Sequence, residues 1–126
     1  MIFRMRDVGF ETETEYGTLQ VAGNSEYGFR PYQLMAASIA VCSGGVMRTI
    51  LDKKRISYED ITMEAHIERN EKEANRITKI AVHFTIKADI SEEQMHKVME
   101  LTTKNCSMVQ SVKDSIEIVE TFQIVK

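Results

Sequence analysis

The sequence predicts an α+β fold in a single domain that covers residues 1–126. Segments with a period of two residues, typical of strands, stand apart from segments with helical periodicity. Hydrophobic residues make up 43% of the 126 residues and charged residues 28%, which is the composition of a globular domain with its own core. The net charge of −3 argues against nucleic acid or an anionic membrane as a partner.

The first third of the chain reads as β structure. Residues 2–7 form an expected strand, and residues 8–22 form an expected hairpin with a Tyr-Gly turn. The segment from Ala22 to Arg30 contains two glycines and is predicted to be a loop.

A long helix is predicted from Pro31 to Arg55. Proline suits the first helical position because its fixed φ fits the helix and its missing N–H would be unpaired there. The run from Pro31 to Met47 carries no charge on any side, whereas a surface helix shows a polar face. We therefore expect a second subunit to cover part of this helix in a homodimer. The alternative is a monomer whose own sheet and second helix surround it.

The second half returns to period two and then to helices. Residues 60–68 and 80–87 alternate apolar and polar side chains, which predicts two antiparallel strands with one wet face. Ser91 and Gln94 match a capping box that starts a helix ending near Asn105. A short helix is expected from Cys106 or Ser107 to Ser115, and a last strand over 116–125, so the order is β-β-β-α-β-β-α-α-β.

The sequence shows neither a targeting signal nor a common catalytic motif. The N-terminus lacks the apolar core of a signal peptide, and the uncharged run is too short and polar for a spanning helix, which predicts a soluble, cytoplasmic protein. The three histidines occupy polar positions and are expected to be solvated: His66, His83 and His96. No CxxC or HxxxH pair supports a zinc site, so neither a metal nor a cofactor is expected.

The two cysteines are the informative residues. Cys42 lies in the uncharged helix just before Ser43 and two glycines, which allow another backbone to pack closely or the helix to bend. Cys106 follows Asn105 and precedes a second capping-box pattern, which places it in the first turn of a helix, where the dipole lowers a thiol pKa. The alternative is that both are small buried hydrophobic residues. Their spacing alone does not show that they meet.

The stretches around these cysteines resemble the OsmC/Ohr family. Residues Arg30-Pro31-Tyr32-Gln33 to Val41-Cys42-Ser43-Gly44-Gly45 look like the central helix of that family. Residues 49–55 and the approach from Leu101 to Ser107 resemble its YhfA-like branch. The order of the β-rich start, cysteine helix, strand pair, second cysteine and final strand also matches, so the resemblance covers nearly the whole chain.

The resemblance implies an OsmC-like fold, in which antiparallel sheets surround a long, buried, cysteine-bearing central helix in an intertwined homodimer. It also implies a thiol-dependent hydroperoxide reductase of oxidative-stress defence, with peroxiredoxin-like activity. Carried over to this sequence, Cys42 is the peroxidatic cysteine that becomes a sulfenic acid, and Cys106 is the resolving cysteine that forms a disulfide with it. An external dithiol then restores the pair.

The sequence departs from the family where the thiolate is held. In the Ohr and OsmC branches a glutamate directly follows the helix-opening proline, and an arginine from the N-terminal region supports the thiolate. Here Tyr32 and Gln33 follow the proline and neither offers a carboxylate. Arg4 and Arg6 share a face of the first strand, but neither aligns with the family's arginine, and the alternative favoured for each is a solvated surface arginine. Arg6, Tyr32 and Gln33 are the residues we expect to support the thiolate.

These departures leave two alternatives open. Burial raises a thiol pKa, so without an arginine Cys42 could be inert and Cys106 the more acidic thiol. The protein could also be a non-catalytic dimer of the same fold that binds a small hydrophobic or thiol-containing ligand.

Overall fold

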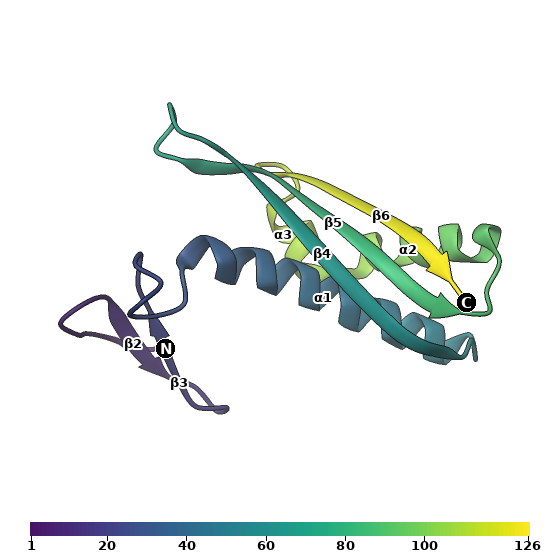
Figure 1. Ribbon diagram of the computed structural model, residues 1–126, viewed down its shortest axis with the longest axis horizontal. Helices are drawn as coiled ribbons and strands as arrows, with labels where there is room; N and C mark the ends of the chain where they lie inside the picture. Colours follow the sequence, from purple (N-terminus) through teal and green to yellow (C-terminus); the bar gives the residue numbers. More distant parts are fainter. The chain divides into compact units, whose positions relative to one another are not determined.

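The computed structural model describes all residues from 1 to 126, which form two compact units, 1–37 and 38–126. The predicted order β-β-β-α-β-β-α-α-β is confirmed (Figure 1). Two three-stranded sheets and three helices make up the chain, so the predicted α+β class is also confirmed.

The N-terminal unit holds a three-stranded antiparallel sheet. Its strands are β1 (Phe3–Met5), β2 (Phe10–Glu13) and β3 (Thr18–Val21), with β2 in the middle. The predicted strand and hairpin are therefore present, although each strand is shorter than expected. Gly9 adopts φ 79°, and a Cβ there would lie 2.3 Å from the carbonyl oxygen of Val21. Only glycine fits this turn, because both the backbone conformation and the space exclude a side chain.

Helix α1 (Pro31–Lys53) begins at the proline, as predicted, and ends two residues before the expected Arg55. Arg55 adopts a left-handed φ of 58° and donates its N–H to the carbonyl of Asp52, while Ile56 N–H bonds to the carbonyl of Leu51 at 2.9 Å. These two bonds form a Schellman motif, which satisfies the last carbonyls and stops the helix.

The second unit contains a three-stranded sheet in the order β4-β5-β6. Strand β4 (Tyr58–Asn70) pairs antiparallel with β5 (Arg76–Ala88), as predicted, but β6 (Glu117–Val125) runs parallel to β5. The expectation of purely antiparallel sheets is therefore wrong for this sheet. The reason is that two helices follow β5 and carry the chain back to the starting edge, and such a crossover returns the next strand in the same direction.

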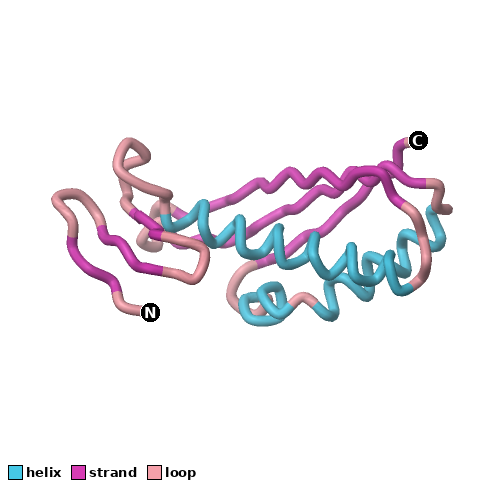
Figure 2. Tube along the Cα trace, turned by 90° about the horizontal axis from the view of Figure 1, so that it is seen from below, coloured by secondary structure: helices cyan, strands magenta, loops and turns pink.

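The helices of this unit lie on one face of that sheet (Figure 2). Helix α2 (Glu92–Asn105) starts with the predicted capping box, in which the Ser91 hydroxyl accepts from Gln94 N–H at 3.1 Å. Helix α3 (Ser107–Val112) ends three residues before the expected Ser115, because the Val112 carbonyl already accepts from two later N–H groups.

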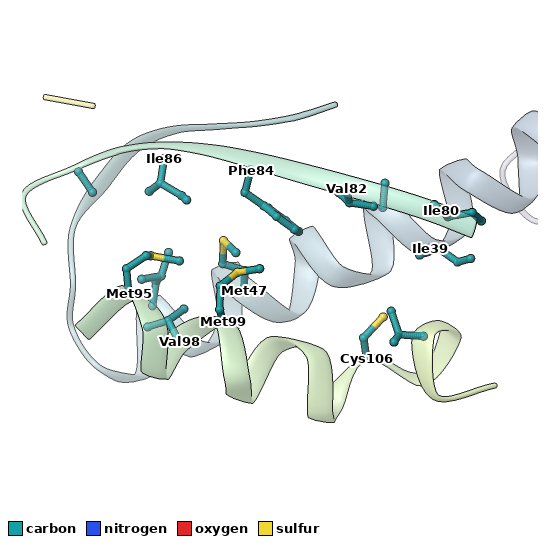
Figure 3. Close-up of a cluster of buried hydrophobic side chains, with 14 of the residues drawn as sticks. Ile39, Met47, Ile80, Val82, Phe84, Ile86, Met95, Val98, Met99 and Cys106 are labelled. Atoms are coloured by element: carbon teal, nitrogen blue, oxygen red, sulfur yellow. The ribbon is translucent and has the colours of Figure 1, made fainter. Parts of the chain in front are cut away.

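One hydrophobic core fills the space between sheet and helices (Figure 3). The inward residues of β5 meet helix residues there, and the fully buried side chains include Phe84, Ile86, Met47, Met95 and Val98. Alternate residues of β5 are buried from Ile80 to Ala88, which confirms the period-two prediction for this part of the strand. The core positions α1 and the α2–α3 junction on the same side of the sheet.

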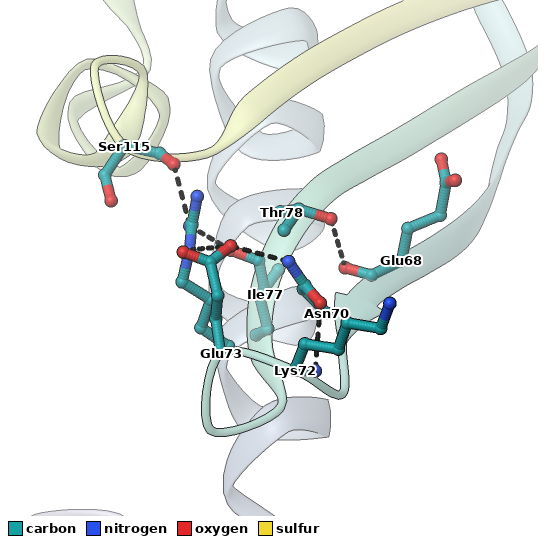
Figure 4. Close-up of polar contacts among 8 residues, drawn as sticks. Glu68, Asn70, Lys72, Glu73, Ile77, Thr78 and Ser115 are labelled. Carbon is teal, nitrogen blue, oxygen red and sulfur yellow. Dashed lines mark hydrogen bonds and ion pairs between the residues drawn. The ribbon is translucent and has the colours of Figure 1, made fainter.

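The turn between β4 and β5 is held by polar contacts (Figure 4). Asn70 Nδ2 donates to the Glu73 carboxylate at 2.6 Å, and two residues of this turn, Ala74 and Asn75, have positive φ. Arg76 Nη1 donates to the carbonyl of Ser115 at 3.3 Å. This contact ties the turn to the segment between α3 and β6.

Within the second unit, helix α1 is buried on one side and exposed on the other. Ile39, Met47 and Leu51 are buried, whereas Val41 is 65% exposed. The helix is also long and apolar enough to cross a membrane on length and composition alone, with a mean hydropathy of 1.6, so the expectation that it is too short and polar for that was wrong. Core helices of soluble proteins share that property, and the buried residues of α1 belong to the core of the second unit.

Candidate functional site: a pair of cysteines with hydroxyl and backbone donors

Cys42 and Cys106 come together at the centre of the second unit. Cys42 lies near the middle of α1 and is half-buried, while Cys106 is fully buried in the core (Figure 3). Both are free thiols, and each side chain acts on the pKa of the other. The two cysteines therefore lie close together in space, which their spacing in the sequence could not show.

The Cys106 backbone joins two helices. It is both the C-cap of α2 and the N-cap of α3, with φ −81° and ψ 109°, and its side chain makes no capping bond. The expectations that Cys106 sits inside the first helical turn and that Ser107 opens a second capping box are therefore wrong. The extended conformation of Cys106 directs the first turn of α3 toward Cys42 instead.

The start of α3 provides donors to the Cys42 sulfur. Burial acts to raise the pKa of Cys42, but hydrogen bonds from the Met108 backbone, the Cys106 thiol and Ser107 together hold this pKa below its ordinary value. The Ser107 contribution includes its hydroxyl, whose oxygen lies 3.8 Å from the Cys42 sulfur, and its backbone. A half-exposed thiol with a lowered pKa is the environment of a reactive cysteine.

Cys106 behaves in the opposite way. Burial raises its pKa, and the hydrogen bond and charge of Cys42 raise it further, although the Ser43 hydroxyl and the Val109 backbone favour its thiolate. Cys42 is therefore the more acidic thiol. The alternative, in which Cys106 is activated by a helix terminus while Cys42 is inert, runs against both pKa directions.

The residues after Cys42 shape its surroundings. A Cβ on Gly44 would lie 2.7 Å from the sulfur of Met63 on β4, so this glycine lets a side chain of the sheet approach the helix. The close neighbour is thus a side chain and not the backbone that the sequence suggested. Gly45 has open space around it and, with Cys42, lines a groove of about 550 Å³.

This groove lies in front of the Cys42 thiol and is mainly aliphatic. Val41, Val46 and Ile50 supply the apolar surface, and Thr49 and Lys53 add a hydroxyl and a positive charge. A small molecule with an apolar body could approach the Cys42 sulfur from this side.

The three residues predicted to support the thiolate belong to the N-terminal unit. Arg6 donates to the carbonyl of Tyr27 at 2.8 Å and forms an ion pair with Glu11 at 3.3 Å. The Arg30 guanidinium stacks 4.8 Å from the ring centre of Tyr32, and Gln33 is exposed in the first turn of α1. Within the second unit, the donors to Cys42 are Cys106, Ser107 and Met108.

The histidines have other partners. His66 pairs with Glu64 at 2.8 Å, His83 Nδ1 lies 2.7 Å from the Thr121 hydroxyl, and His96 packs against the edge of a phenylalanine ring. No three side chains of His, Cys, Asp or Glu are grouped as metal ligands.

Sequence reasoning missed the two serines of the site. The sequence patterns assigned a chemical role to neither Ser107 nor Ser43. One signal is present in the printed sequence, because each cysteine is followed directly by a serine.

The comparison with family models identifies the chain. Residues 23–121, which include both cysteines and all the elements from α1 to most of β6, match the model of the OsmC-like protein family. The chain belongs to this family. The resemblance inferred from the sequence is therefore confirmed, while membership of the YhfA-like branch stays a prediction.

Similar proteins and structures agree with this assignment. A Staphylococcus aureus "organic hydroperoxide resistance protein-like" protein is 26% identical over 90 residues, covering 70% of this chain and 64% of the relative. The chain thus spans somewhat less than two thirds of the length of the curated relatives it matches.

Solved structures show the same OsmC-like fold. A hypothetical protein from Aquifex aeolicus has a TM-score of 0.88 at 24% identity, with 98% of this chain and 93% of that chain covered. An OsmC-like protein from Mycoplasma pneumoniae has a TM-score of 0.83 at 14% identity, with coverage of 93% and 89%.

Proposed function

We propose that this OsmC-like protein is a thiol-dependent hydroperoxide reductase of peroxide-stress defence, with Cys42 as the peroxidatic and Cys106 as the resolving cysteine. The observation that carries the proposal is the asymmetry of the pair. One thiol is accessible from a groove and acidified by hydrogen bonds, and its partner is fully buried behind it. Relatives named as organic hydroperoxide resistance proteins support the same role.

The first step takes place at the Cys42 sulfur. The thiolate attacks the outer oxygen of a hydroperoxide, so an S–O bond forms while the O–O bond breaks. The alkoxide leaves, takes up a proton and departs as an alcohol. The hydroperoxide is reduced by two electrons, and Cys42 is oxidised to a sulfenic acid.

The second step engages Cys106. Its sulfur attacks the Cys42 sulfenic sulfur, the S–S bond forms and the S–O bond breaks, and the hydroxide that leaves combines with the Cys106 proton to give water. An external dithiol then supplies two electrons and two protons, which return both cysteines to thiols. The pKa of Cys106 can stay high until this step, because only Cys42 must be a thiolate at the start.

The sequence lacks the family's glutamate after the helix-opening proline, and the donors at the start of α3 favour the Cys42 thiolate in its place. Two backbone groups, a hydroxyl and a thiol act on one sulfur. Such hydrogen bonds to a charged group are among the stronger ones in proteins. The missing carboxylate therefore does not by itself argue against activity.

The same proposal includes a homodimer in the cytoplasm. The exposed apolar side of α1, with Val41 at its centre, supports a covering subunit. Free thiols at the site fit a reducing compartment.

The decisive experiment compares the native chain with Cys42→Ser. With tert-butyl or cumene hydroperoxide and a dithiol donor, the native chain should consume peroxide and Cys42→Ser should not. After a stoichiometric pulse of peroxide, the mass of each native chain should fall by about 2 Da, the loss of two hydrogens in a disulfide. Full turnover by Cys42→Ser would exclude the mechanism.

A non-catalytic binder of the same fold is the second candidate, favoured by the aliphatic groove of about 550 Å³ beside Cys42. In that case the peroxide pulse should oxidise methionines slowly, without the loss of two hydrogens. Binding of a small apolar ligand should then be the same in the native chain and in Cys42→Ser.

A further inference from the structure

The two Cys-Ser dipeptides cross each other in space. Ser107, which follows Cys106, has its hydroxyl oxygen 3.8 Å from the sulfur of Cys42. Ser43, which follows Cys42, is fully buried and near enough to Cys106 to favour its thiolate, but it makes no hydrogen bond to the thiol. Each serine therefore lies near the cysteine of the other dipeptide.

The Ser43 hydroxyl is unusual among the helical hydroxyls of this protein. Thr49, Thr102 and Ser111 each donate to the carbonyl four residues earlier, at 3.1, 2.8 and 2.7 Å. Ser43 does not, and its buried oxygen has no hydrogen-bond partner. A buried hydroxyl without a partner is costly, and Ser43 carries that cost in the resting thiol state.

A thiolate at Cys106 would be that acceptor. It accepts hydrogen bonds more strongly than a thiol does, because the sulfur then carries the negative charge. The core around Cys106 is apolar, helix α3 carries no titratable side chain, and the charge acting on Cys106 comes from Cys42. Lys53, on the groove in front of Cys42, is the cation on that side.

We propose that Ser107 and Ser43 are positioning residues that serve the two cysteines in successive steps, Ser107 favouring the Cys42 thiolate and Ser43 the Cys106 thiolate. This proposal rests on the redox function proposed above. When Cys42 has become a sulfenic acid, its own negative charge is gone and Cys106 can lose its proton. The Ser43 hydroxyl then donates to the Cys106 thiolate, which attacks the Cys42 sulfur. The S–O bond breaks, and the departing hydroxide and the released proton form water.

The test measures each thiol separately and needs no peroxide. In a Cys106→Ser background, the pH dependence of Cys42 alkylation by iodoacetamide is followed with and without Ser107→Ala. In a Cys42→Ser background, the same is done for Cys106 with and without Ser43→Ala. Ser115→Ala, at an exposed serine just beyond α3, is the matched control in both backgrounds.

A crossed pattern is expected. Ser107→Ala should lower the acid dissociation constant of Cys42 by only about threefold, because the 3.8 Å contact that it removes is long. The acid dissociation constant of Cys106 should not change. Ser43→Ala should lower that of Cys106 about tenfold, the effect of one hydrogen bond to a charged group, and leave Cys42 unchanged. In the otherwise native chain, Ser43→Ala should prolong the lifetime of the Cys42 sulfenic acid about tenfold, as measured by dimedone trapping, without slowing its formation.

Ser43→Ala should not lower the melting temperature, because it removes a buried hydroxyl that has no partner in the resting state. Ser43→Thr keeps the hydroxyl and should restore the Cys106 titration. Equal changes at both cysteines from either variant, or an unchanged Cys106 in Ser43→Ala, would overturn the proposal. Because the titrations are independent of turnover, a failure of the hydroperoxide reductase function would be seen separately.

Discussion

The hydroxyl oxygen of Ser107 lies 3.8 Å from the sulfur of Cys42, although 65 positions separate the two residues in the chain. The α2–α3 junction makes this contact, because the extended backbone of Cys106 ends one helix and starts the next beside α1. The same junction brings the Met108 backbone to that sulfur. The reactivity of Cys42 therefore depends on a short six-residue helix that contributes no charged side chain.

The two thiols should titrate in a definite order. Hydrogen bonds hold the Cys42 pKa below its ordinary value, so its thiolate persists to lower pH, whereas burial keeps Cys106 protonated to higher pH. As the pH is raised, we expect alkylation at Cys42 to reach its half-maximal rate first, as followed by peptide mass spectrometry. Labelling of Cys106 at the lower pH would reverse the assignment of roles.

The same coupling predicts an effect of Cys42→Ser on its neighbour. The Cys42 side chain raises the Cys106 pKa through its hydrogen bond and its charge. Removing the Cys42 thiol should therefore lower the Cys106 pKa toward its ordinary value, and alkylation of Cys106 should shift to lower pH. No shift, or one to higher pH, would show that the two thiols do not interact.

The exposed side of α1 should form a subunit interface. Val41 is 65% exposed, and a charge placed there would have to be buried against an apolar partner at a cost of several kcal/mol. Val41→Glu should convert the homodimer to a monomer in size-exclusion chromatography with light scattering. Lys113→Glu, at an exposed position just after α3, is the control and should remain dimeric. A native chain that runs as a monomer would contradict the prediction.

Gly9 should be far less replaceable than Gly23. Ala at position 9 would adopt an unfavourable φ of 79° and place its Cβ 2.3 Å from a backbone oxygen, so we expect a loss of at least about 2 kcal/mol of stability. Gly23→Ala meets no atom within 4 Å and should change stability by less than about 0.5 kcal/mol. Thermal unfolding of the two variants checks this, and equal melting temperatures would contradict it.

The capping box of α2 offers a test of a feature visible in the sequence. Ser91→Ala removes the acceptor for the Gln94 N–H and should cost about 1 kcal/mol. Ser115→Ala, outside any helix, should leave the unfolding free energy unchanged. Chemical denaturation measures both, and similar losses in the two variants would remove the cap as the cause.

Local patterns predicted most of the elements, because each pattern reflects the immediate chemistry of the chain. The alternation along β5 and the proline at the start of α1 correspond to elements that the structure contains. The end of α1 was misjudged because it depends on the left-handed conformation of Arg55. Arginine, unlike glycine, gives no sequence signal for that conformation. The parallel pairing of β6 with β5 was missed for a similar reason. The direction of β6 depends on the path of the chain through α2 and α3, which local patterns do not show.

The sequence by itself determined which elements form, and it singled out Cys42 and Cys106 as the candidate reactive residues. Only the tertiary structure decided that the two thiols lie close together, that Cys42 is the more acidic, and that two serines act on them. The physical reason is that a helix is built from neighbours in the chain. A thiol pKa is instead set by burial and by donors within a few ångströms, and the donors to Cys42 come from a distant helix.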